Sequence, residues 1–238
     1  MNYALVTGTD HGLGLALTDC LLARGYFVIA CRLNPQETLI DKRMEDNSPR
    51  LKILELDISS DESVRAMKDQ VSAFVPCLDL LINNVGILGN MDKNLGDDLN
   101  FDEILQVINV NAVGTLRVTN ALAGLVMKSK QKTIVNVSSE AGSIGSCFRT
   151  GWFGYCMSKA ANNMQSALVY NNIQKDGGRL IAMHPGHVAT YMRGHLDTTA
   201  SISPEDSAKS ILHTVLDTEL PSEDKPLYIN YSGHRLPW

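Results

Sequence analysis

The sequence predicts an α/β fold, a single doubly wound domain whose parallel sheet of about seven strands has helices on both faces. Short apolar runs alternate along the chain with longer stretches in which apolar residues recur at helical spacing. Continuously apolar runs are typical of strands covered on both faces, and each return between parallel strands needs a crossover. The chain has 238 residues without repeat, linker or low-complexity tract, so residues 1–238 are expected to form one domain.

The elements follow in order along the chain. The expected strands are the apolar runs at residues 4–6, 26–31, 51–57, 78–82, 132–137, 179–184 and 227–229. The expected helices are the periodic stretches at residues 13–23, from Ser59 to about 74, 102–127, 154–174 and 204–216. Gly25 is suited to end the first helix, and Ser59 with Glu62 has the spacing of a capping box. Residues 32–50 are polar and turn-rich, and no regular element is expected there.

Composition narrows the class of protein. Lys and Arg number 21 against 26 Asp and Glu, and a net charge of -5 argues against a nucleic-acid partner. The N-terminus has no signal peptide pattern, and no segment approaches the ~20 apolar residues that cross a bilayer. The five Cys form no Cys-x-x-Cys motif, which favours free thiols in a reducing compartment. A cytoplasmic protein is therefore expected.

The first strand ends in a glycine-rich turn that opens the first helix. Gly8, Gly12 and Gly14 lie there, where a dinucleotide pyrophosphate meets unpaired N–H groups at a helix N-terminus. Glycines let the backbone approach the phosphates and let the helix pack closely on the sheet. A glycine triplet alone also fits an ordinary tight turn, but its position between strand and helix favours dinucleotide binding.

The end of the second strand indicates which dinucleotide is preferred. An NAD enzyme usually has an acid there for the ribose 2′-hydroxyl, whereas this chain has Arg32. A guanidinium suits a 2′-phosphate, so NADP(H) is predicted over NAD(H). The alternative is that Arg32 is only a solvated loop residue.

Further motifs stand at the ends of later strands and on two helices. They are Asn83-Asn84-Val85-Gly86, Asn111 with Gly114, Ser138-Ser139, Tyr155-x-x-x-Lys159, Pro185-Gly186 with Thr190, and Asp57. In this order, and with the glycine spacing, they resemble the single-domain short-chain dehydrogenase/reductases over essentially the whole chain. Residues 185–192 and the end of the chain are similar to the C-factor-like (sniffer-like) carbonyl reductase branch.

The resemblance implies a set of site residues. Its catalytic residues are Asn111, Ser139, Tyr155 and Lys159. Its cofactor-binding residues are Gly8, Thr9, His11, Gly12, Leu13, Gly14, Arg32, Asp57, Ile58, Asn84, Val85, Gly86, Tyr155, Lys159, Pro185, Gly186, Val188 and Thr190. No metal is expected, because His184 and His187 lack the further ligands that a zinc site needs.

The chemistry is hydride transfer between nicotinamide and a carbonyl or alcohol carbon, with Tyr155 as proton donor or acceptor. Lys159 lies four residues later on the same helix face, and its ammonium is expected to lower the pKa of the phenol. Ser139 is expected to bond the substrate oxygen, and Asn111 to hold a water by the resemblance. The plain alternatives are that Tyr155 and Lys159 form an ordinary helix-surface pair, that Ser139 caps the strand end, and that Asn111 is a buried structural amide.

Three departures from the family pattern bear on function. Val85 replaces a small alanine, Glu140 directly follows Ser139, and the loop before Tyr155 is long and carries Cys147, Phe148 and Arg149. This loop is expected to border the substrate, a small carbonyl or alcohol. The expected assembly is a homodimer or homotetramer. The rival interpretation is a cofactor-binding regulatory or signalling protein with little turnover.

Overall fold

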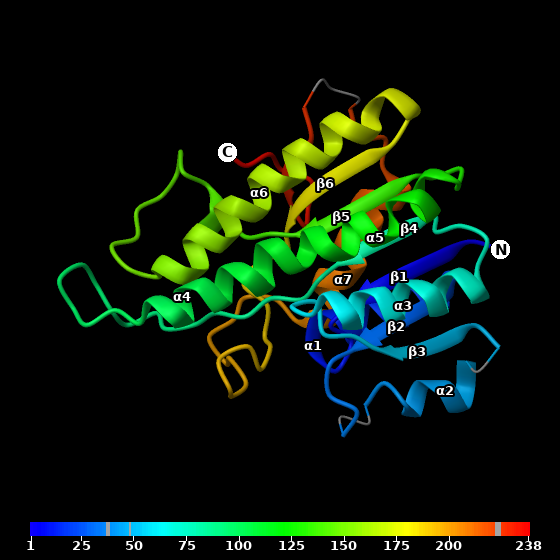
Figure 1. The fold of residues 1–238 in the computed structure, drawn as a ribbon, viewed down its shortest axis with the longest axis horizontal. Helices are drawn as coiled ribbons and strands as arrows, with labels where there is room; N and C mark the ends of the chain where they lie inside the picture. The colour runs from blue at the N-terminus through cyan, green and yellow to red at the C-terminus, as the bar shows by residue number, and fades with distance from the viewer. Residues whose placement is uncertain (37–38, 48, 222–224) are drawn as a thin grey trace.

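A seven-stranded parallel sheet with strand order β3-β2-β1-β4-β5-β6-β7 forms the centre of the molecule (Figure 1). The computed structural model describes residues 1–36, 39–47, 49–221 and 225–238. The strands are β1 Tyr3–Thr7, β2 Phe27–Arg32, β3 Leu51–Glu55, β4 Leu80–Asn83, β5 Thr133–Val137, β6 Arg179–His184 and β7 Leu227–Asn230. The expected doubly wound fold is confirmed. The strand order reverses between β1 and β4, which is where ligands bind in such sheets.

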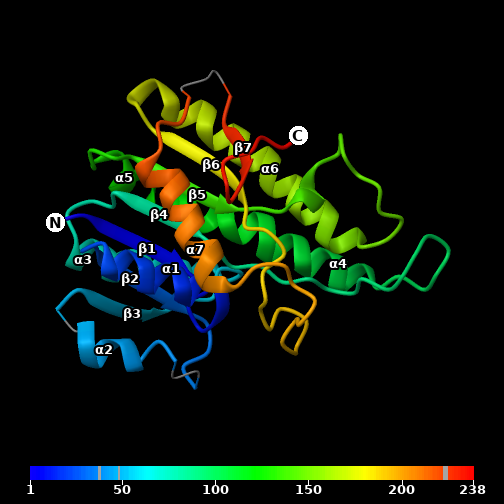
Figure 2. The ribbon, with the colours of Figure 1, turned by 180° about the vertical axis from the view of Figure 1, so that it is seen from behind.

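Helices cover both faces of the sheet, as Figures 1 and 2 show from opposite sides. The first face carries α3 Asp61–Phe74, α5 Thr115–Met127 and α6 Phe153–Ile173, and α4 Phe101–Ile108 packs against α6. The other face carries α1 Gly12–Ala23 and α7 Pro204–Leu212, and the short α2 Lys42–Asn47 lies beside β3.

Alternate residues of the central strands point into two separate cores. Leu5 and Ile29 face α3 and α5, whereas Val6 and Val28 face α1 and α7. All four side chains are fully buried. Because successive strand residues point to opposite faces, both sets must be apolar, which explains the continuous apolar runs in the sequence.

Two local expectations were wrong. The helix α2 lies within residues 32–50, where no regular element was expected. Ser60, not Ser59, caps α3, and its hydroxyl accepts from the backbone N–H of Ser63. Ser59 is not available as the cap, because its N–H and hydroxyl both donate to the Asp57 carboxylate.

The expected helix over residues 102–127 contains a π-helical turn. α4 runs into a π turn at Asn109–Gly114, which continues as α5. The helical run Phe101–Met127 is long and apolar enough to cross a membrane by length and composition, contrary to expectation, and half of its apolar window is buried. Its buried side chains, such as Val118 and Leu122, pack in the core on the sheet, as expected for a helix of a doubly wound fold.

Candidate active site

The predicted site residues meet at the edge of the sheet where the parallel strands end. β1 ends before Gly8, β4 before Asn84, β5 before Ser138 and β6 before Pro185. The sheet order makes β4 the neighbour of both β1 and β5, and β6 the neighbour of β5. Segments far apart in sequence are therefore adjacent at one edge, which is the usual location of a ligand site in this architecture.

The glycine turn has the backbone geometry that its sequence predicts. Gly8 has φ +71° and Gly12 has φ +60°, a region that residues with a side chain rarely adopt. A Cβ on Gly14 would lie 2.0 Å from the Gly8 carbonyl oxygen, so α1 starts in direct contact with the turn. The side-chain amide of Asn84 donates to the carbonyls of Thr7 (3.0 Å) and Gly8 (3.2 Å), and thereby holds the turn in shape.

The first turn of α1 is open for an anion. Side chains cap α3, α4 and α7, namely Ser60, Asn100 and Ser203. The residue before α1, His11, makes no capping hydrogen bond, and the first turn contains no acid. A phosphate is the group that such free N–H groups and the helix dipole favour. The turn and the helix start together fit a dinucleotide.

The side chains of Thr9 and Leu13 in this turn are buried. The backbone N–H of Thr9 donates to the Cys31 carbonyl at 3.0 Å, while its hydroxyl oxygen has no hydrogen-bond partner among the described residues. The side chain of Leu13 packs into the core of the α1 face. Leu13 therefore reaches a cofactor only through its backbone.

The segment after β6 returns to the glycine turn. A Cβ on Gly12 would lie 3.2 Å from the methyl carbon of Thr190, and the rings of His11 and Tyr191 are 6.1 Å apart. Gly186 has φ +88°, and the Pro185 carbonyl accepts a hydrogen bond from the Ser207 hydroxyl at 2.7 Å.

The same segment is braced from within. Val188 forms a β-bridge with Ile202, and the Nε2 atom of His187 lies 2.9 Å from the Asp197 carboxylate. These contacts place Gly12 and Thr190, predicted cofactor-binding residues from opposite ends of the sequence, beside each other.

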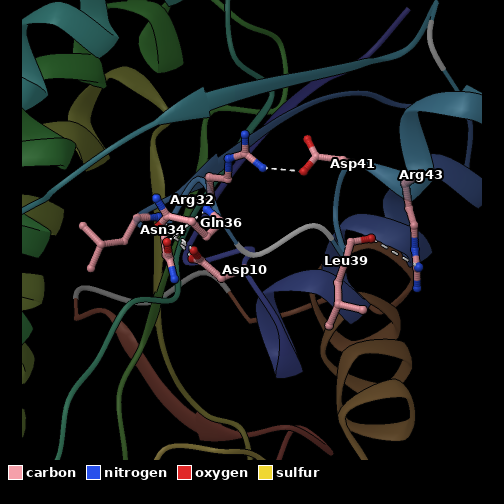
Figure 3. A network of polar contacts seen from close by, with 8 residues as sticks. Asp10, Arg32, Asn34, Gln36, Leu39, Asp41 and Arg43 are labelled. Atoms are coloured by element: carbon pink, nitrogen blue, oxygen red, sulfur yellow. Dashed lines mark hydrogen bonds and ion pairs between the residues drawn. The ribbon is translucent and has the colours of Figure 1, made fainter.

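Arg32 is mostly buried and held by an acid (Figure 3). Its Nη1 lies 2.6 Å from the Asp41 carboxylate, and 14% of its side chain is exposed. The nearby Asp10 carboxylate accepts from the backbone N–H groups of Leu33 and Asn34. Arg32 is therefore not the solvated loop residue of the alternative interpretation. Neither acid was among the predicted site residues, because Asp41 lies nine residues from Arg32 in the turn-rich segment and Asp10 lies 23 residues from Leu33.

Residues after β3 and β4 complete the cofactor-binding set. Asp57 uses one carboxylate oxygen to accept from Ser59, and the side chain of Ile58 is buried against Gly114. Val85 packs directly on the glycine turn, since a Cβ on Gly8 would lie 3.0 Å from its Cγ2. Contact between Ile58 and a cofactor stays a prediction, which its side-chain position does not favour.

Gly86 lies beside two of the predicted catalytic residues, Lys159 and Asn111. A Cβ there would lie 3.4 Å from Lys159 Nζ and 3.5 Å from Asn111 Oδ1. Because residue 86 has no side chain, the backbone of the segment after β4 lies close to Lys159 and Asn111. The space that a Cβ would fill stays open beside the lysine.

Ser139, Tyr155 and Lys159 lie together as predicted, and all three are buried. The side chain of Ser139 lies near enough to the phenol of Tyr155 to lower its pKa. Lys159 Nζ lies 5.6 Å from the centroid of the Tyr155 ring and donates to the Val137 carbonyl at 3.0 Å. The hydroxyl of Tyr228 donates to the Ser139 carbonyl at 2.5 Å, which fixes the serine from β7.

The pKa of Tyr155 differs from the expectation. Burial raises it above its ordinary value, and the proximity of Ser139 only partly offsets this effect. Lys159 is not among the main groups that shift the pKa of Tyr155, and burial lowers the pKa of its own ammonium to about 8, so the lysine is still mainly charged at neutral pH. In the protein alone the desolvation of both groups outweighs their attraction.

Asn111 makes the contacts of a structural amide. Its side-chain nitrogen donates to the Ile87 carbonyl (2.8 Å) and the Ser158 hydroxyl (2.9 Å), and its oxygen accepts from the Ile87 N–H (2.8 Å). The amide therefore ties the π turn to α6 and to the segment after β4. Its oxygen keeps one lone pair for a further donor, and the water-holding role stays a prediction.

The loop before Tyr155 contributes residues that were not predicted as site residues. Glu140 pairs with Arg149, whose guanidinium stacks on Trp152, and the edge of Trp152 meets the Tyr155 ring. The departure of Glu140 from the family pattern was the one available signal. Its partner Arg149, nine residues away, was expected only as part of the long loop that borders the substrate, and nothing local in the sequence indicated that the two would pair.

The structure also gives the surroundings of the residues considered for metal binding and of the cysteines. In the part of the chain that the structure describes, no group of three His, Cys, Asp or Glu side chains is placed to hold a metal ion. The Nδ1 atom of His184 is buried without a hydrogen-bond partner there. All five cysteines of the sequence are free thiols.

Comparisons with known proteins agree with this geometry. The family model described as "short chain dehydrogenase" matches residues 2–201. An uncharacterised oxidoreductase of Schizosaccharomyces pombe is 30% identical over 250 residues, which cover 98% of this chain and 96% of the relative.

Two solved structures have the same fold. The carbonyl reductase Sniffer of D. melanogaster has a TM-score of 0.91 at 24% identity, with both chains covered completely. The NADPH-bound carbonyl reductase from chicken fatty liver has a TM-score of 0.89 at 27% identity, covering 100% of this chain and 94% of that one. The family match over most of the chain, together with the buried Ser139, Tyr155 and Lys159 beside the glycine turn, shows that this chain is an oxidoreductase of the short-chain dehydrogenase family.

Proposed function

We propose that this oxidoreductase is an NADP(H)-dependent carbonyl reductase or alcohol dehydrogenase in which Tyr155 is the acid and base. The observation that carries the proposal is the buried group of Ser139, Tyr155 and Lys159 at the sheet edge, beside a glycine turn that fits a dinucleotide. The turn and α1 would hold the pyrophosphate, and the segment from Pro185 to Thr190 would hold the nicotinamide end. When bound, the nicotinamide supplies or accepts the hydride.

The chain's own residues handle the oxygen of the substrate. In the reductive direction the Tyr155 hydroxyl gives its proton to the carbonyl oxygen as that oxygen gains negative charge. The Ser139 hydroxyl bonds the same oxygen and stabilises the developing charge. Lys159 lies within 5.6 Å of the Tyr155 ring centroid, so a positive charge on it favours the phenolate that remains. In the oxidative direction the phenolate accepts the proton of the alcohol.

Arg32 supports the preference for NADP(H). Its guanidinium is fixed at the end of β2, where a ribose 2′-substituent lies in such folds, and the similar carbonyl reductase from chicken fatty liver has NADPH bound. The Asp41 carboxylate competes with a phosphate for this guanidinium. We expect NADPH to bind more tightly than NADH, and Asp41→Asn to widen the difference. Tighter NADH binding in the unmodified chain would contradict the assignment of Arg32.

The proposed reaction is tested by measuring NADPH oxidation with aldehydes, ketones and quinones. Tyr155→Phe keeps the ring and removes the proton, so it is expected to lower kcat about 10²–10⁴-fold. The variant should still bind NADPH, which a fluorescence titration checks. Equal turnover in Tyr155→Phe would refute the mechanism. Saturable NADPH binding without turnover of any carbonyl would instead support the regulatory alternative.

A second copy of this chain is the proposed partner. Exposed apolar side chains lie along α4 and α6, which run side by side in Figure 1. They include Phe101 and Leu105 on α4 and Met157, Met164 and Leu168 on α6. Burial of this stripe in a homodimer or homotetramer would remove it from water.

The free thiols support the proposed cytoplasmic location.

A further inference from the structure

The short helix at Glu140–Gly142 and the loop between it and α6 carry a cluster of four side chains, one of which, Trp152, contacts Tyr155. Two are charged, Glu140 and Arg149, and two are aromatic, Phe148 and Trp152. None of them is among the predicted catalytic or cofactor-binding residues. Their contacts form a continuous path from the carboxylate after Ser139 to the ring of Tyr155.

Arg149 is the centre of this cluster. Its Nη2 lies 2.5 Å from Glu140 Oε1, and its guanidinium carbon lies 4.7 Å from the Phe148 ring centroid and 4.8 Å from that of Trp152. Only 14% of the Arg149 side chain is exposed, although Phe148 itself is largely exposed. An arginine held by a carboxylate and two rings is fixed in place, unlike an arginine in a solvated surface pair.

Trp152 connects Arg149 to Tyr155 on α6. It precedes the helix with φ 62° and ψ 32°, a left-handed conformation that a bulky residue adopts only when its surroundings hold it there. Its ring meets the Tyr155 ring edge-on, with centroids 6.3 Å apart. The guanidinium of Arg149 stacks on Trp152. It therefore helps to hold the tryptophan ring in the position from which that ring contacts Tyr155.

The charges of the cluster also act on the phenol. The positive charge of Arg149 lowers the pKa of Tyr155 and the negative charge of Glu140 raises it, both less strongly than burial does. The other titratable groups near the phenol are Lys159 and Cys156 on α6 and Tyr228 on β7. Burial lowers the pKa of His184 at the end of β6, and the charges of Glu140, Lys159 and Arg149 affect it less.

We propose that Arg149 is a positioning residue for Tyr155, which orients the tyrosine ring through Trp152, and that Glu140 anchors the guanidinium. The proposal rests on the proposed function for its kinetic consequence, but the position and ionisation of Tyr155 are measurable without turnover. Opposite effects are expected from the two partners. Loss of Arg149 disfavours the phenolate, whereas loss of the Glu140 charge favours it.

The test is a pH titration of Tyr155 by NMR, with tyrosine labelled with ¹³C at the ring carbon that bears the hydroxyl. The resonance of Tyr155 is identified by its absence in Tyr155→Phe. Arg149→Met is expected to shift this resonance and move its midpoint to higher pH, and Glu140→Gln to move the midpoint lower. Arg149→Lys keeps the charge, so it should restore the midpoint but not the resonance position, which depends on the stacked Trp152.

The kinetic counterpart is the pH profile of alcohol oxidation. A three- to tenfold lower phenolate fraction, about half to one pKa unit, should reduce kcat/KM by the same factor at neutral pH in Arg149→Met. The KM for NADP⁺ should stay unchanged. A chain that turns over no substrate would refute the proposed function and leave the NMR result to decide the role of Arg149.

The matched control is Arg24→Met, since Arg24 also pairs with a carboxylate, Asp217 at 2.8 Å, but at the opposite edge of the sheet. It should leave the Tyr155 resonance and midpoint unchanged. The proposal is overturned if Arg149→Met and Glu140→Gln leave the midpoint unchanged or move it in the same direction. If Arg149→Met does not fold, Glu140→Gln alone decides, because its carboxylate is half exposed and the glutamine oxygen still accepts from the guanidinium, so that only the charge is removed.

Discussion

A residue placed in the site for its charge can lower the stability of the fold, and Lys159 is the example. Lys159 is buried, and its pKa falls from 10.5 to about 8 because burial disfavours the charged form. The folded state therefore binds fewer protons than the unfolded state between these two values. The sign of the linkage follows: the charged lysine destabilises the fold at neutral pH, and stability is recovered as pH rises from about 8 toward 10.5.

Lys159→Met should consequently be more stable than the unmodified chain at pH 7, by about 1–3 kcal/mol. The lower end of this range allows for the loss of the hydrogen bond from Lys159 to the Val137 carbonyl. Urea unfolding from pH 7 to pH 10 measures the difference, which should shrink as the pH rises. Lys128→Met, at an exposed position, serves as the control and should show no such trend. A Lys159→Met variant that is less stable throughout would contradict the account.

Two glycines show how position decides the effect of the same substitution. In Gly14→Ala the new Cβ would lie 2.0 Å from the Gly8 carbonyl oxygen, so we expect a loss of about 1–3 kcal/mol and of NADPH binding. Gly124 lies in α5 with nothing within 4 Å, so Gly124→Ala should stabilise the chain by about 0.5–1 kcal/mol. Thermal unfolding and NADPH titration of both variants test the pair. Equal behaviour of the two would contradict the packing of α1 on the turn.

At the scale of elements, the segment after β6 is an irregular loop that one carboxylate organises. Asp197 accepts from the hydroxyl of Thr199 (2.6 Å) and from His187 Nε2 (2.9 Å), and its own N–H donates to the Thr190 carbonyl. The hydrogen bonds from Thr199 and His187 hold the pKa of Asp197 well below its usual range. This stabilisation is present above the ordinary carboxyl pKa and is lost as pH falls through the lowered one.

Asp197→Asn should therefore loosen residues 187–202 without unfolding the domain. Because Thr190 lies against Gly12, we expect the KM for the nicotinamide cofactor to rise about three- to tenfold, the loss of roughly one hydrogen bond. Faster hydrogen exchange confined to this loop would support the assignment. Asp206→Asn, in the first turn of α7, is the control. An unchanged KM in Asp197→Asn would show that the loop does not hold the cofactor.

At the scale of the whole molecule, the apolar stripe on α4 and α6 predicts self-association. Met164 is 63% exposed and Leu168 58% exposed on the outer side of α6, where monomeric proteins rarely expose adjacent apolar side chains. Met164→Glu should convert the proposed homo-oligomer to monomers, as measured by light scattering after size exclusion. Phe74→Glu, on α3, should leave the assembly unchanged. A monomeric unmodified chain would refute the proposed assembly.

Local patterns predicted much of the fold and part of the site. The strands and long helices are where apolar runs and helical spacing indicate them, because a doubly covered sheet admits only apolar strands. The glycine turn was predictable, since a positive φ and close helix packing both require glycine. The helix α2 was not, because it is short and lies in a polar segment whose packing against β3 is not local.

By itself, therefore, the sequence determined the doubly wound sheet, the glycine turn and the pairing of Tyr155 with Lys159, the proposed catalytic residues, whose four-residue spacing puts both on one helix face. The tertiary structure alone decided which charges meet: Arg32 with Asp41, Arg149 with Glu140, and His187 with Asp197. It also decided the direction of the Tyr155 pKa, since burial exceeds the influence of the lysine. The reason is physical. Backbone preferences and apolar periodicity act between near neighbours in sequence, whereas ion pairing and desolvation depend on which distant segments the fold brings together.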